Sequence, residues 1–121
     1  MAVSDTPSAS QDAVPEPSFH DEGATRVLTY GDLEVRATPN KIGVYTAISV
    51  TNRYRKPASY EIKISVADGA GWVAHNNFRI QDVQPGTTGR DATVIGGEHL
   101  GPIPQRPKIY VDQYNPIIND R

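Results

Sequence analysis

The chain has 121 residues, no cysteine, and 12 basic against 14 acidic side chains, which gives a formal net charge of -2. This length is enough for one domain with its own core, and the missing cysteines exclude disulfides and thiolate metal sites. No apolar run of about 18 residues occurs, so no membrane span is predicted.

Residues 1–22 are predicted to form a disordered acidic arm ahead of a folded domain over residues 23–121. The first part of the arm is rich in Ser, Ala, Pro and Asp, and it buries too little apolar surface to offset the entropy lost on ordering. Residues 1–25 carry five acids and no base (-5), whereas residues 26–121 carry nine acids and 12 bases (+3), which sum to -2. The arm is either a tether to an anchor or a plain flexible terminus.

The first ten residues have neither the basic start nor the apolar stretch of a signal peptide. If the protein is exported, we therefore expect its export or anchor segment to lie outside this chain.

Short strands are predicted along the rest of the chain. The clearest alternates Tyr60, Ile62, Ile64 and Val66 with polar residues, so that one set faces a core and the other faces solvent. A helix would need apolar spacings of three and four, which this segment lacks. In chain order, the predicted strands are Arg26–Tyr30, Leu33–Ala37, Val44–Asn52, Ser59–Ala67, Trp72–Ala74, Phe78–Val83, Ala92–Ile95 and Ile109–Tyr114.

About seven or eight short strands separated by turn residues predict an all-β protein, an immunoglobulin-like antiparallel β-sandwich of about seven strands preceded by the disordered arm. A small Greek-key barrel has the same periodicity and stays the structural alternative.

Three segments in a fixed order carry a resemblance to a known class of domain. Val50-Thr51-Asn52 ends a strand, Ala67-Asp68-Gly69 ends the next one, and Ile80-Gln81-Asp82-Val83-Gln84-Pro85-Gly86-Thr87-Thr88 follows. This order resembles small immunoglobulin-like domains of secreted or membrane-anchored proteins of Gram-positive bacteria, especially actinobacteria. The resemblance covers about residues 33–95 and implies an extracytoplasmic, non-enzymatic domain. It carries no catalytic residue to this chain, and the Pro-rich segment before the last strand departs from the pattern.

Catalytic, metal-binding and cofactor-binding residues are all predicted to be absent. His20, His75 and His99 stand far apart in the sequence, and no pair of histidines has the spacing of a metal site. The glycines form no phosphate-binding fingerprint.

One basic cluster, Arg53-Tyr54-Arg55-Lys56, is a candidate partner-binding loop. Three cations and an aromatic ring at a loop tip are able to contact an anionic group. The alternative is a solvated turn, and a charge of +3 over the domain is too small to predict nucleic-acid binding.

The last predicted strand supplies two further candidates, Tyr110 and Tyr114. If Ile109 and Val111 face the core, strict alternation places both tyrosines on the solvent side in a row that a partner could contact. The single tryptophan, Trp72, is expected in the core.

The sequence therefore favours a non-enzymatic interaction or ligand-binding module, extracytoplasmic and tethered by its arm, whose partner is an unidentified protein or cell-envelope component. A structural or spacer domain of a cell-surface or phage assembly is the alternative, and an enzyme with an unrecognised site is a lesser one. A cytoplasmic location stays open.

Overall fold

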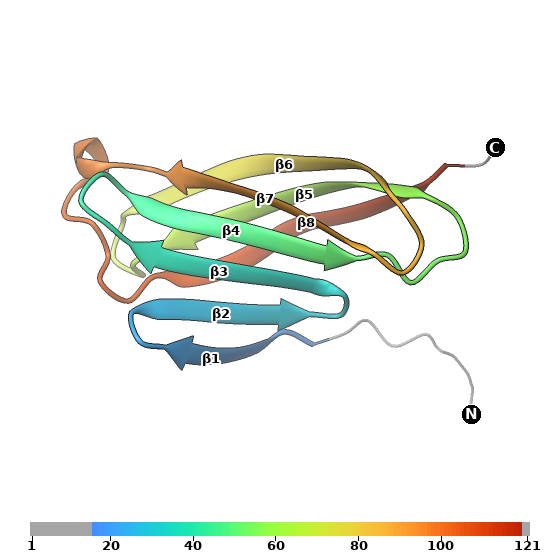
Figure 1. Cartoon of the computed structure of the whole chain (residues 1–121). Helices are drawn as coiled ribbons and strands as arrows, with labels where there is room; N and C mark the ends of the chain where they lie inside the picture. The colour runs from blue at the N-terminus through green and yellow to red at the C-terminus, as the bar shows by residue number, and fades with distance from the viewer. Residues whose placement is uncertain (1–15, 120–121) are drawn as a thin grey trace, which may run out of the picture.

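The computed structural model describes residues 16–119. They form two antiparallel β-sheets stacked face to face, which confirms the predicted all-β class (Figure 1). Within residues 16–119, the one helical element is a single 3-10 turn, η1 (Glu98–Leu100). The strands are β1 (Ser18–Glu22), β2 (Thr25–Tyr30), β3 (Leu33–Pro39), β4 (Val44–Thr51), β5 (Ala58–Ala67), β6 (Val73–Val83), β7 (Thr88–Ile95) and β8 (Lys108–Ile118).

The two sheets differ in width. A five-stranded sheet has the order β1-β2-β3-β4-β7, and a three-stranded sheet has the order β6-β5-β8. β6 lies next to β7 at one side of the sandwich, and β2 approaches β8 at the other. β1 therefore extends the five-stranded sheet beyond the edge of the three-stranded one.

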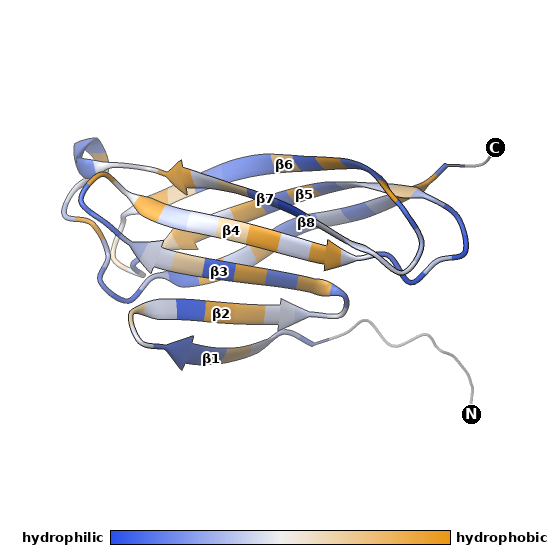
Figure 2. Cartoon of the chain, in the orientation of Figure 1, coloured by the Kyte–Doolittle hydropathy of each residue, from blue (hydrophilic) through white to orange (hydrophobic). Residues whose placement is uncertain are grey.

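Alternating side chains build the core between the sheets. Along β5, Tyr60, Ile62, Ile64 and Val66 are each at most 2% exposed, while the residues between them are half-buried. The same alternation of buried and more exposed residues runs along β4, and Figure 2 shows the orange bands of its apolar residues. A period of two sends every second side chain inward, so the predicted facing of β5 is confirmed.

Trp72 closes the core at the end that carries η1, as expected. It is 2% exposed, and its indole Nε1 donates a hydrogen bond to the carbonyl oxygen of Gly97 at 3.2 Å. It lies in the turn before β6 rather than in a strand, which corrects the predicted strand Trp72–Ala74.

β6 is one strand where the sequence predicted two, which polar His75, Asn76 and Asn77 separate. They continue the strand because β6 is an edge strand, whose outer face and free edge are solvated.

The expected domain boundary also changes. Ser18–Glu22, assigned to the arm, forms β1 and pairs antiparallel with β2. Every residue of β1 is exposed, and Phe19 is its only large apolar side chain, so no apolar alternation marked it. Backbone pairing and contacts with Arg26 hold it: the guanidinium lies 4.8 Å from the Phe19 ring centroid, and Arg26 Nη1 donates to Asp21 Oδ1 at 3.2 Å. Of the rest of the predicted arm, residues 1–15 lie outside the described residues.

Replacing Ile64 with Ala should lower the free energy of unfolding by roughly 2–5 kcal/mol, because the removed atoms leave a cavity in a fully buried site. Urea denaturation followed by tryptophan fluorescence measures this. Val73→Ala, at a side chain that is 52% exposed, is the matched control and should change stability by less than about 0.5 kcal/mol. Equal midpoints for the two variants would contradict the assignment of Ile64 to the core.

Candidate interaction surface

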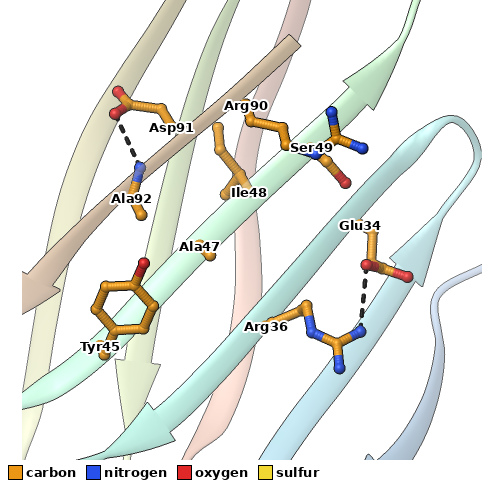
Figure 3. A pocket seen from close by; sticks show the side chains of 9 residues that line it. All are labelled: Glu34, Arg36, Tyr45, Ala47, Ile48, Ser49, Arg90, Asp91 and Ala92. Atoms are coloured by element: carbon orange, nitrogen blue, oxygen red, sulfur yellow. Dashed lines mark hydrogen bonds and ion pairs between the residues drawn. The ribbon is translucent and has the colours of Figure 1, made fainter. Parts of the chain in front are cut away.

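A hollow opens in the outer face of the five-stranded sheet, where small outward residues of neighbouring strands meet. The register aligns Arg36, Ala47 and Ala92 in one row across β3, β4 and β7, and Glu34, Ser49 and Arg90 in the adjacent row. Alanine and serine side chains are too short to fill the space between the longer ones around them. The result is a depression of about 420 Å³, the sheet-face hollow, lined by Glu34, Arg36, Tyr45, Ala47, Ile48, Ser49, Arg90, Asp91 and Ala92 (Figure 3).

The arginine on β3 is held in place by two carboxylates. Arg36 Nη1 donates to Glu34 Oε1 at 3.4 Å, and Arg36 Nη2 donates to a carboxylate oxygen of Glu22. The hydrogen bond with His20, followed by that with Arg36, lowers the pKa of Glu22, and the hydrogen bond with Glu22 raises the pKa of Arg36. These groups are solvated, so their ion pairs position side chains more than they stabilise the fold.

The arginine on β7 has different surroundings. Arg90 is exposed and, within residues 16–119, forms no ion pair, although Figure 3 shows its side chain reaching over Ser49. Tyr45 stands on the other side of the hollow and is 45% exposed. The hollow thus combines a floor of small side chains, an accessible aromatic ring and a guanidinium that, having no ion pair among the described residues, can donate hydrogen bonds to a carboxylate.

Sequence reasoning did not predict this site. Tyr45, Ala47 and Ser49 were readable as the outward positions of one strand, but Ala92 comes from a strand much later in the chain. Only the register between β4 and β7 brings Ala92 beside Ala47.

The predicted basic cluster lies on the loop between β4 and β5, and its four residues, Arg53, Tyr54, Arg55 and Lys56, are all exposed. Arg53 Nε donates to Asp32 Oδ1 at 2.6 Å, which directs this side chain back toward the turn between β2 and β3. The structure therefore keeps the four candidates together, away from the sheet-face hollow, and their binding role stays a prediction.

A buried asparagine shapes this loop. Asn52 is 0% exposed, and its Nδ2 donates to the carbonyl oxygens of Lys56 and Val83, both at 2.8 Å. Its Oδ1 accepts from the backbone N–H of Tyr54 at 2.7 Å. One side chain thus satisfies three backbone groups and fixes the loop conformation.

The predicted tyrosine row does not form. Tyr110 is 49% exposed, but Tyr114 faces the core and packs against two other tyrosines. Its ring stacks on Tyr60 at 6.1 Å and meets Tyr30 edge-on at 5.9 Å between centroids. The reason is a β-bulge at Asp112, since Ile64 pairs with Val111 whereas Lys63 pairs with Gln113. The extra residue reverses the alternation, so Tyr114 turns inward.

The histidines do not converge. His20 on β1 hydrogen-bonds Glu22 at 2.8 Å, and His75 on β6 and His99 on η1 are exposed on other elements. Among residues 16–119, no three His, Asp or Glu side chains are grouped to hold a metal ion. No helix of this part of the chain is long and apolar enough to cross a membrane.

Replacing Asn52 with Ala should cost about 1–3 kcal/mol in unfolding free energy, because the carbonyls of Lys56 and Val83 and the N–H of Tyr54 lose their partner. Amide hydrogen exchange at Tyr54 should become faster in the same variant. Asn77→Ala, at an exposed strand position, is the control. A stable variant with unchanged exchange at Tyr54 would show that Asn52 does not fix the loop.

Stability should fall as the pH rises above about 10, the ordinary pKa of tyrosine. Burial raises the pKa of both Tyr114 and Tyr60. The unfolded chain therefore loses these phenol protons at a lower pH than the folded chain, and ionisation favours unfolding. Urea titrations from neutral to strongly alkaline pH should show a smaller fall for Tyr114→Phe, with parallel curves below about pH 9. Identical alkaline curves would contradict the inward position of the Tyr114 hydroxyl.

Comparison with known proteins does not place this chain in a family. No protein-family model, no curated protein and no solved structure matches it. The resemblance to small immunoglobulin-like domains of Gram-positive bacteria therefore stays a prediction.

Proposed function

We propose that this chain is a non-enzymatic protein-interaction module with an immunoglobulin-like sandwich fold, and that the outer face of its five-stranded sheet is the contact surface. The observation that carries the proposal is the sheet-face hollow, where a floor of Ala47, Ser49 and Ala92 lies open beside the exposed ring of Tyr45.

The shape of the hollow suits a side chain of a partner protein. Binding energy at protein interfaces is concentrated in a few buried anchors, among which tyrosine, tryptophan and arginine are frequent. A depression of about 420 Å³ on a sheet face has room for one or two large side chains. Tyr45 can pack against such an anchor, and the small floor lets the partner approach the backbone closely.

The charges around the hollow indicate which groups should flank the anchor. Arg36 is already held by Glu22 and Glu34, whereas Arg90 has no ion pair among the described residues. A partner carboxylate beside the apolar anchor would form an ion pair with Arg90. We therefore expect a partner segment in which an aromatic or aliphatic residue stands next to an acidic one.

An extracytoplasmic location and a tethering arm belong to the same proposal. They are supported by the resemblance and by the acidic Ser/Ala/Pro-rich composition of the first residues. The partner is then a protein of the cell envelope or its surroundings.

The test is a selection of binding peptides from a random library displayed on phage, with the full-length chain as bait. We expect selected peptides to pair an apolar anchor with an acidic residue and to shift the amide NMR signals of Ala47 and Ala92. Ala47→Arg fills the hollow and should weaken their binding at least about tenfold. Asn77→Arg, an exposed position on the outer face of the other sheet, is the matched control and should leave binding unchanged.

A selection that yields no specific peptide would contradict the proposal and favour the structural or spacer role. Peptides that shift only Tyr54 and Arg55 would move the contact surface to the basic loop.

A further inference from the structure

An apolar groove runs along the side of the sandwich where the five-stranded sheet is wider than the three-stranded one. It has a volume of about 580 Å³. This edge groove lies between β1, β2 and β8 and is lined by Pro17, Phe19, Leu28, Tyr30, Ile109, Tyr110, Val111 and Asp112.

The groove exists because β1 has no strand opposite it. Phe19 pairs with Leu28 in the register, so both side chains point to the same side of the sheet. Leu28 is 1% exposed under the cover of the other sheet, whereas Phe19 is 43% exposed. The three-stranded sheet ends at β8, and a further strand beside β8 would lie directly under Phe19.

The free edge of β8 is regular in its first half, which borders the groove. Its second half contains the bulge at Asp112 and Pro116. Both features hinder pairing with another strand, because a bulge disrupts the hydrogen-bond ladder and proline has no N–H to donate. Its first half, Lys108–Val111, carries neither and contributes Ile109, Tyr110 and Val111 to the groove. The unprotected edge and the uncovered apolar surface therefore coincide.

We propose that an extended segment of a partner protein adds to β8 as a fourth strand and inserts alternate apolar side chains under Phe19. Backbone hydrogen bonds would come from the edge of Lys108–Val111, as in other cases of strand addition. This surface is separate from the sheet-face hollow, so the inference goes beyond the proposed function.

The charges at the two ends of the groove define the chemistry of that segment. Asp112 marks one end. At the other end, Lys108 precedes Ile109 and, with Arg26, Arg106 and Asp21, lines a separate hollow of about 500 Å³. A strand antiparallel to β8 runs from Asp112 toward Lys108. The charges of such a strand complement those of the groove when its first residue is basic and its last residue is acidic. Between them, every second residue should be apolar.

Two other occupants fit less well. The first is a second copy of this chain, with its β8 paired antiparallel to β8 of the first copy. The two-fold axis that relates such copies is perpendicular to the joined sheet, so both five-stranded sheets would lie on the same side of that sheet. The two copies would then clash, because β1 of each would need the space that β2 of the other occupies. The second is the segment of residues 1–15 of this chain. Its sequence contains Pro7 and Pro15 and no alternating apolar residues, so it is not expected to pair as a strand.

The experiment uses two blocked seven-residue peptides of identical composition. The first has the order lysine, valine, threonine, valine, threonine, valine, aspartate, and the second exchanges the lysine and the aspartate. With the isotope-labelled full-length chain, the first peptide should shift the amide signals of Phe19 and Ile109–Val111 at millimolar concentrations and slow amide exchange along Lys108–Val111. The second should bind at least about tenfold more weakly, because in the antiparallel orientation its charges oppose those of the groove.

Phe19→Asp should abolish these shifts, and Ile42→Asp is the matched control, at an apolar side chain that is 66% exposed and lies away from the groove. The proposal is overturned if neither peptide shifts the β8 signals, if both bind equally, or if the shifts map to Ala47 and Ala92 instead. It is equally overturned if the β8 signals depend on protein concentration without peptide, which would indicate a second copy. Altered β8 signals on deletion of residues 1–15 without peptide would identify the arm as the occupant.

Discussion

Burial of one face of each sheet against the other is the constraint on which the rest of the structure depends. Ile48 and Val50 of β4 and Ile62 and Ile64 of β5 belong to a single buried cluster, and each is at most 2% exposed. Because alternate residues of a strand point to opposite faces, burial of these side chains also fixes which residues face solvent. A register shift by one residue would expose the whole inward set, so the outer surface is determined as firmly as the core.

The sheet-face hollow is a direct consequence of that constraint. Outward positions of a sheet are free of the packing demands of the core, and here the row through Ala47 and Ala92 is occupied by small side chains. The neighbouring Arg36 is drawn toward Glu22 and Glu34 rather than over this floor. Small residues and a charge pair therefore leave open a surface that larger side chains would close.

Two departures from a regular sandwich of equal sheets shape the surface of this protein. The bulge at Asp112 turns Tyr114 into the core, where it packs between Tyr30 and Tyr60, and leaves Tyr110 alone on the surface. The addition of β1 makes one sheet wider than the other and leaves Phe19 without a layer beneath it. The first departure removes a predicted recognition row, and the second creates an apolar groove at a free strand edge.

The sequence by itself determined the all-β class, the facing of β5, the burial of Trp72 and the position of the basic loop, because these follow from local alternation and turn residues. It did not determine the path of β8 after Asp112, since a bulge depends on how two strands fit together rather than on either strand alone. It also missed β1, whose contacts with β2 stabilise a segment with no apolar pattern of its own. The sheet-face hollow and the edge groove were decided only by the tertiary structure, because each is lined by residues that are distant in sequence and that cross-strand register and unequal sheet width bring together.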